Sequence, residues 1–334
     1  MRFLQLVILI FILISCKKEN IYYYADHKQI KDSTVIRFVD EELEKLKINT
    51  KEKKLKIYTT LDSTSYKNNL DSIRNKIFEK SLHYSLKPED KEAFDEWFRE
   101  KIIVIDNQNG KVINYYSSFK NLKYDRNGVN LNGFRKIIRL GSLLNENPDA
   151  KVGENNLFNP NIQSTPQDSL KIKEREKRFL SEFNIRKLNQ QAYFYNNVSF
   201  LDAIQIFQTL NNGIVAKPSV IIEVLNKNKT VYRQNIKSKK ILNKKSLDKI
   251  QQNLKYYKKN SFGAFENQLK NTENILFFGY NNIDYFMMLD DGKYTYLIFN
   301  FSAVITDIEK KRIKMIPHIW MKKAGLRYYN AIRK

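Results

Sequence analysis

The clearest alternation of apolar and polar residues lies between positions 99 and 136. A continuous apolar run covers residues 102–105, a polar turn ending at Gly110 follows, and a β-rich run returns at residues 112–116. Two such runs joined by a short turn of Asp, Asn and Gly are typical of a β-hairpin. Because the first run is apolar at every position, we expect a strand that is buried on both faces.

Elsewhere the chain mixes helical and strand-like spacing. Apolar residues at helical spacing predict helices over residues 35–46, 132–145, 199–212 and 246–258. Ser199 and Asp202 are placed as a capping box for the third of these helices, and Gly213 is placed to end it. Further strands are predicted at residues 55–61, 220–225, 230–234, 275–280, 284–289 and 294–301.

The N-terminus has the pattern of an export signal. Residues 1–15 carry one early arginine followed by a nearly unbroken apolar stretch, which is typical of a signal peptide and short for a membrane span. The stretch ends at Leu13, Ile14, Ser15 and Cys16, and this resembles the lipobox of bacterial lipoproteins. The resemblance implies cleavage before Cys16 and lipidation of its thiol. A signal anchor with an incidental cysteine is the alternative. The polar residues 16–34 are interpreted as a tether.

Composition limits the classes of function. The chain has 334 residues, a formal net charge of +23, three histidines and one cysteine. No internal disulfide can form, and we expect neither a metal site nor a cofactor. The positive charge is spread along the chain without an RNA-binding aromatic signature or zinc-finger spacing, so no nucleic-acid partner is predicted. The segment of residues 147–173 is polar, contains three of the six prolines and is predicted to be a surface loop.

Several segments resemble a known family in the order in which they occur. Residues 58–62 read Tyr-Thr-Thr-Leu-Asp after a helical segment, which is similar to the linker of class A penicillin-binding proteins. The hairpin at residues 102–116 resembles the opening of their transpeptidase domain, residues 198–218 resemble a later helix and strand, and residues 315–329 resemble the closing C-terminal helix. The resemblance implies an α+β fold with a central antiparallel sheet flanked by helices. It divides the chain into signal peptide (1–15), tether (16–34), linker region (35–100) and transpeptidase-like domain (101–330), without the glycosyltransferase domain.

The catalytic motifs of that family are degenerate here. In the family a serine nucleophile begins a buried helix and a lysine follows three residues later, where it can take the serine proton. Aligned on this pattern, Gly133 falls at the serine and Lys136 at the lysine. A Lys-Thr-Gly motif on a later strand aligns with Phe277, Phe278 and Gly279. The family's Ser-x-Asn motif occurs nowhere in the chain.

A second pair fits the Ser-x-x-Lys pattern as written. Ser117 and Lys120 lie directly after the second strand of the hairpin. The residues that follow lack an apolar helical period, so we do not expect this pair to be held one turn apart in a buried helix. We interpret it as the end of a strand that runs into a polar loop.

These observations predict a lipid-anchored and catalytically inactive transpeptidase homologue, which acts as a binding or scaffold module in the bacterial cell envelope. Its expected partners are the membrane through Cys16, and peptidoglycan or other envelope proteins. The outer membrane is the preferred location, and the sequence does not distinguish its periplasmic face from its surface face. One alternative is an active D,D-transpeptidase or carboxypeptidase that uses Ser117 and Lys120. Another is an unrelated basic lipoprotein that binds anionic glycans or lipids.

Overall fold

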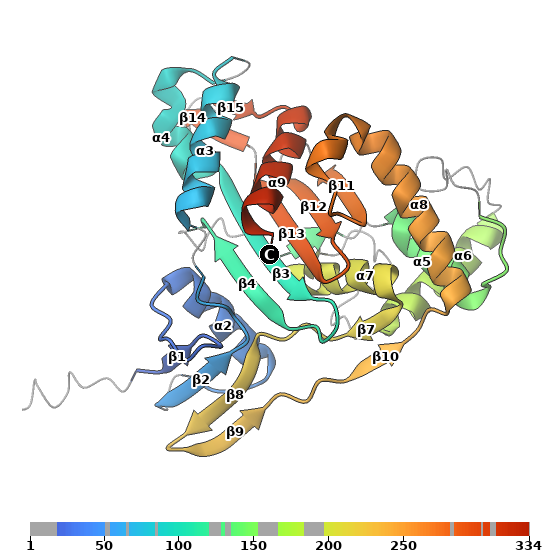
Figure 1. Ribbon diagram of the computed structural model, residues 1–334, viewed down its shortest axis with the longest axis horizontal. Helices are drawn as coiled ribbons and strands as arrows, with labels where there is room; N and C mark the ends of the chain where they lie inside the picture. The colour runs from blue at the N-terminus through green and yellow to red at the C-terminus, as the bar shows by residue number, and fades with distance from the viewer. Residues whose placement is uncertain are drawn as a thin grey trace, which may run out of the picture. The chain divides into compact units, whose positions relative to one another are not determined.

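The structure is a computed structural model that divides the chain into two compact units (Figure 1). The described residues are 19–50, 54–64, 67–83, 86–119, 128–130, 135–152, 166–183, 197–280, 284–301, 303–307 and 312–333. The first unit combines Met1–Ser63 with Ser219–Asn235, and the second combines Thr64–Pro218 with Ile236–Lys334. The predicted boundary between the linker region and the transpeptidase-like domain lies at residue 100, whereas the first compact unit ends at Ser63 and also includes the segment Ser219–Asn235.

In the part that the structure describes, the first unit is a small four-stranded sheet with one helix. Its strands follow the order β1-β2-β8-β9, with β1 at Ile21–Tyr23, β2 at Leu55–Thr59, β8 at Ile221–Asn226 and β9 at Lys229–Arg233. Helix α2 (Ser33–Lys45) begins after Asp32, whose carboxylate accepts the Thr34 and Val35 N–H groups, and it buries Val35, Phe38, Val39 and Leu43. The predicted strands and helix of this region are confirmed.

Part of the segment interpreted as a tether is folded into this sheet. Strand β1 pairs in parallel with β2, and the Tyr22 hydroxyl donates a hydrogen bond to Asp40 at 2.6 Å. Tyr23 stacks on Tyr58 with the ring centroids 5.0 Å apart. Consecutive tyrosines favour a pleated, half-buried surface, so a segment that is polar on average still contributes a strand.

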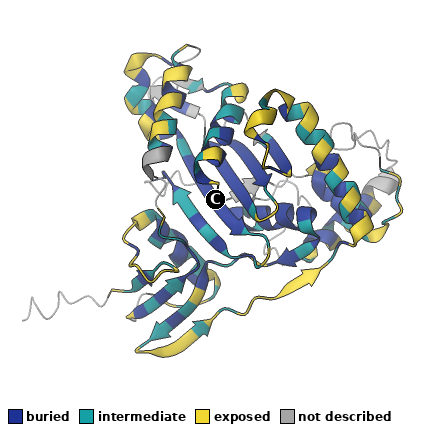
Figure 2. Cartoon of the chain, viewed as in Figure 1, coloured by how far each residue is buried: buried dark blue, intermediate teal, exposed yellow. Residues whose placement is uncertain are grey.

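The second unit is built on a five-stranded antiparallel sheet in the order β11-β12-β13-β3-β4. The strands are β3 (Arg99–Asp106), β4 (Val112–Ser117), β11 (Asn274–Tyr280), β12 (Asp284–Asp290) and β13 (Tyr294–Phe301). The predicted hairpin is confirmed as β3 and β4, and β3 is buried at every position from Glu100 to Ile105. Figure 2 shows the central strands as the most buried part of this unit.

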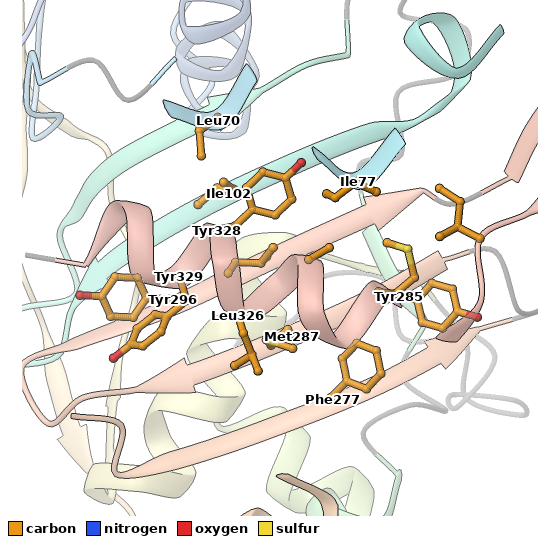
Figure 3. Close-up of a cluster of buried hydrophobic side chains, with 14 of the residues drawn as sticks. Leu70, Ile77, Ile102, Phe277, Tyr285, Met287, Tyr296, Leu326, Tyr328 and Tyr329 are labelled. Carbon is orange, nitrogen blue, oxygen red and sulfur yellow. The ribbon is translucent and has the colours of Figure 1, made fainter. Parts of the chain in front are cut away.

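One face of this sheet is covered by the C-terminal helix. Helix α9 (His318–Ile332) packs on β12 and β13 and also contacts α3 (Lys67–Ser81). Together these elements enclose a large apolar cluster (Figure 3). A Cβ atom on Gly325 would lie 2.7 Å from the Met287 sulfur, so a glycine permits this close approach of α9 to the sheet. Helix α4 (Lys91–Trp97) adds Phe94 to the same cluster.

The opposite face is covered by helix α7 (Phe200–Asn212), which contacts β12 and β13. The predicted capping box is confirmed, because Ser199 accepts the Asp202 N–H and Asp202 accepts the Ser199 N–H. Gly213 ends the helix with a φ of 78°. Further helices of this unit are α5 (Arg135–Glu146), α6 (Pro166–Ser181) and α8 (Lys244–Phe262).

Two features differ from the predicted elements. The last part of the predicted loop at 147–173 is helical, because α6 begins at Pro166, and proline is well suited to the first turn of a helix. Short elements that the pattern does not predict are β5 (Gly128–Asn130), β6 (Asn197–Ser199), β7 (Ile214–Ala216), β10 (Ser238–Lys240), β14 (Ala303–Asp307), β15 (Arg312–Met315) and η5 (Gly263–Gln268). The short helix η1 (Pro88–Asp90) directly precedes α4. Elements of three to six residues are too short to reveal a period.

Candidate functional site

Strand β11 occupies one edge of the five-stranded sheet and carries the residues that align with Lys-Thr-Gly. Gly279 pairs with Tyr285 of β12, and Phe277 pairs with Met287. The Phe277 ring stacks on Tyr285 with centroids 5.9 Å apart and meets the edge of His318 at 4.9 Å. Phe277 therefore belongs to the apolar cluster beneath α9 (Figure 3) and is 6% exposed.

Phe278 lies on the other face of the same strand and is half-buried. Its ring stacks on Phe286 at 5.1 Å, and Phe286 contacts Phe299 at 4.9 Å. Phe200, at the start of α7, lies 5.3 Å from Phe299. A continuous row of phenylalanine rings thus runs from the edge strand to the middle of the sheet, and it occupies the face that α7 covers.

A buried cation lies at the end of this aromatic row. Lys101 of β3 is 3% exposed, and its Nζ lies 4.8 Å from the Phe200 ring centroid and 5.5 Å from that of Phe119. Such positions over a ring face are attractive for an ammonium group. The cation is therefore engaged with the surrounding rings.

The start of α5 is the second part of the predicted site. Gly133 lies outside the described residues. Lys136 is in the first turn of α5 and is exposed, whereas the buried face of this helix is formed by Ile137, Ile138, Leu140, Gly141, Ser142 and Leu144. In the arrangement that the resemblance implies, the lysine shares a buried face with the nucleophile. The exposed Lys136 departs from that arrangement.

The alternative nucleophile ends strand β4. Ser117 is 5% exposed, and its Oγ accepts a hydrogen bond from the Phe119 backbone N–H at 3.3 Å. Residues 118 and 119 have no regular secondary structure, and Lys120 lies outside the described residues. A serine on a strand end, with its hydroxyl engaged by its own chain, fits the interpretation of Ser117 as the end of a strand.

One buried titratable group near this region is not predicted from the sequence. Glu100 of β3 is fully buried, and burial raises the pKa of its carboxyl group. The Tyr116 hydroxyl donates to Glu100 Oε1 at 3.4 Å. A glutamate directly before an apolar run resembles a residue at a solvated strand end, so no sequence signal marks it as buried. Within the described ranges, no cluster of three His, Cys, Asp or Glu residues could hold a metal ion.

The chain is similar to known proteins in its structure. No protein-family model matches the sequence, and no curated protein matches it. The penicillin-binding protein PonA1 from Mycobacterium tuberculosis superimposes with a TM-score of 0.55 at 12% identity, covering 90% of this chain and 89% of that one. PonA1 in complex with penicillin V gives a TM-score of 0.54 at 13% identity, covering 89% of this chain and 91% of that one.

This similarity defines the fold class as α+β. The chain has the fold of the penicillin-binding transpeptidases, as the resemblance in its sequence implies. The five-stranded sheet, the covering helix α9 and the edge strand β11 are thus parts of a transpeptidase-like domain. No helix within the described part of the chain is both long and apolar enough to cross a membrane.

Proposed function

We propose that this protein is a lipid-anchored, non-catalytic penicillin-binding-protein homologue, which acts as a binding or scaffold module in the bacterial cell envelope. The observation that carries the proposal is the aromatic packing of Phe277 and Phe278 on opposite faces of β11, where Phe277 is buried against Tyr285 and Phe278 is half-buried against Phe286. In the resembled family these positions hold a lysine and a hydroxyl that bind the substrate carboxylate. Phenylalanine offers no hydrogen-bond donor to a carboxylate.

The chemistry of acyl transfer supports the same conclusion. A nucleophile forms the covalent intermediate, and its loss alone lowers the rate by several orders of magnitude. Glycine at position 133 has no side chain to acylate. The exposure of Lys136 removes the partner that would activate a serine there, and Phe277 and Phe278 remove the groups that stabilise the developing charge. Three separate requirements are thus missing.

The anchor and the location follow from the N-terminal residues. Lipidation of Cys16 would hold the protein on a membrane, with the outer membrane as the preferred location. Stable anchoring takes more than one acyl chain, which the modification of bacterial lipoproteins supplies. Peptidoglycan is the preferred partner, because the fold is shared with proteins that act on it.

Intact-protein mass spectrometry after incubation with a reactive penicillin tests the absence of catalysis. We expect no covalent adduct on the folded full chain in detergent. Ser117→Ala is the matched variant: an adduct on the wild type that disappears in Ser117→Ala would establish the alternative enzyme. An adduct on both would place the nucleophile elsewhere and would also overturn the proposal.

Sedimentation with isolated peptidoglycan tests the binding role separately. The full chain in detergent is mixed with purified sacculi and centrifuged, and a tube without sacculi serves as the control. We expect the protein in the pellet only when sacculi are present. A protein that stays in the supernatant at low salt would exclude peptidoglycan as the partner while leaving the result with penicillin unaffected.

A further inference from the structure

A cleft separate from the residues discussed above lies where α8 meets the beginning of β11. It has a volume of about 890 Å³ and is lined by the C-terminal half of α8, the short helix η5 (Gly263–Gln268) and residues 269–274. Figure 1 shows α8 beside β11, with their connection at one end of the helix. This volume is within the range of small-molecule sites in proteins.

The charges around the cleft are mainly positive. Four lysines line it against two glutamates: Lys255, Lys258, Lys259 and Lys270, with Glu266 and Glu273. In α8, Lys258 and Lys259 follow Lys255 by three and four residues, so both lie next to it on one side of the helix. Like charges at this spacing repel one another, and an anion bound among them would relieve that repulsion.

The four lysines differ in their present contacts. Lys258 donates to the backbone carbonyls of Leu269 (3.2 Å) and Thr272, so it ties the connection between η5 and β11 to the helix. Lys255, Lys259 and Lys270 are exposed and form no ion pair with any described carboxylate. These three ammonium groups can turn toward a ligand in the cleft.

The acidic residues leave this positive side accessible. The Glu273 carboxylate lies beside Gly292, in the turn between β12 and β13. Glu266 is exposed on η5, where its carboxylate can accept a hydrogen bond from a ligand hydroxyl. The cleft thus combines cations with hydrogen-bond acceptors.

A buried polar atom gives an independent indication of a ligand. Asn274, the first residue of β11, lines the cleft and is 1% exposed, and its Oδ1 has no hydrogen-bond partner among the described residues. A buried amide oxygen without a donor costs about 1–3 kcal/mol. A ligand that brings a hydroxyl group to this oxygen would remove the cost. Gln251 and Asn267 add further amide groups to the lining.

From this combination we infer that the cleft binds an acidic sugar, meaning a saccharide unit that carries a phosphate or carboxylate group. The ammonium groups of Lys255, Lys259 and Lys270 receive the anionic group. Asn274 accepts a hydrogen bond from one sugar hydroxyl. Other sugar hydroxyls can form hydrogen bonds with Gln251, Asn267 and Glu266. This inference does not depend on the loss of transpeptidase chemistry, because none of these residues belongs to the degenerate motifs.

Isothermal titration calorimetry on the full chain in detergent tests the site, with glucose 1-phosphate, glucuronate, glucose and inorganic phosphate as probes. We expect both acidic sugars to bind, glucose to bind at least tenfold more weakly, and inorganic phosphate to bind more weakly than glucose 1-phosphate. The absence of binding by both acidic sugars would overturn the inference. So would equal affinities for inorganic phosphate and glucose 1-phosphate, because the site would then recognise charge alone.

Two sets of variants locate the binding. The double variant Lys255→Gln/Lys259→Gln should weaken glucose 1-phosphate binding at least tenfold, whereas the matched double variant Lys229→Gln/Lys237→Gln removes the same charge elsewhere and should change it less than twofold. Equal losses in the two would attribute the binding to net charge and overturn the site. Asn274→Ala should weaken both acidic sugars while leaving inorganic phosphate unchanged. Circular dichroism verifies the fold of each variant, and the lysine pair decides the question if Asn274→Ala does not fold.

Discussion

Phe278 of the edge strand β11 stacks on Phe286 of β12, with ring centroids 5.1 Å apart and an interplanar angle of 20°. Offset stacking of this kind adds to the energy of apolar burial. At a position where the resembled enzymes place a substrate-binding group, this chain thus has a half-buried aromatic ring that packs on the neighbouring strand. The edge of the sheet is stabilised by aromatic packing, and polar chemistry is absent from these two positions.

Restoring the family's lysine should unfold this region without restoring activity. Phe277→Lys would place an ammonium group among Tyr285 and His318, with Lys322 Nζ already 5.6 Å from the ring centroid. We expect a loss of about 3 kcal/mol or more in the free energy of unfolding, measured by urea denaturation. The control is Ile319→Lys on α9, where the side chain is 47% exposed, and it should cost less than about 0.5 kcal/mol. Equal midpoints for the two variants would contradict the burial of Phe277.

Gly141 should resist replacement although it lies within a helix. A Cβ atom there would lie 2.6 Å from Leu210 Cδ2 and 3.0 Å from Phe179 Cζ. Overpacking of this kind costs about 1–3 kcal/mol, which exceeds the gain of roughly 1 kcal/mol in helix propensity. Gly141→Ala should therefore lower the thermal midpoint.

Gly263→Ala is the matched control for Gly141→Ala, because no atom lies within 4 Å of the added methyl group. Its backbone φ of −52° suits alanine, so the variant should be neutral or stabilised by about 0.4–1 kcal/mol. A Gly141→Ala variant as stable as Gly263→Ala would mean that α5 and α7 are not closely packed at this point.

Asp290 should make the stability depend on pH. Burial raises the pKa of its carboxyl group from 3.8 to about 6, even though Asn107, Thr295 and the Gly292 N–H donate hydrogen bonds to it. The folded state then binds more protons than the unfolded state between about pH 4 and pH 6, so stability falls as the pH rises through this interval. The difference between the two pKa values of Asp290 corresponds to roughly 3 kcal/mol in the free energy of unfolding.

The Asp290→Asn variant isolates this contribution. The difference in unfolding free energy between wild type and variant should move in favour of the variant by about 3 kcal/mol from pH 4 to pH 7. Urea denaturation at several pH values measures it. A difference that stays constant with pH would show that Asp290 titrates alike in the folded and unfolded states.

Cys16 should decide where the protein resides in the cell. Cys16→Ser removes the thiol that lipidation requires, so the protein should no longer incorporate a labelled fatty acid or sediment with membranes. Ser117→Ala is the control, because it also changes a single side chain but leaves the lipobox intact. Membrane association that persists in Cys16→Ser would favour the uncleaved signal anchor.

Local pattern determined much of the fold. The apolar run that became β3, the capping box at Ser199 and the helix-ending Gly213 all depend on residues within one turn or one strand of each other. Such short-range rules act in the same way in any context. The order of these segments also carried the resemblance to the transpeptidase family, and the similarity to solved structures confirms that fold.

Contacts between distant segments decided the rest. Residues Ile21–Tyr23 form strand β1 because they pair with β2, although residues 16–34 are polar on average. The environments of Phe277 and Phe278 depend on α9 and α7, which lie about forty and seventy residues away. The lysine-lined cleft required α8, η5 and the start of β11 to meet. The sequence alone determined which residues replace the catalytic motif, and only the tertiary structure determined that Phe277 is buried and Lys136 exposed, because burial is a property of the neighbours that the fold brings together.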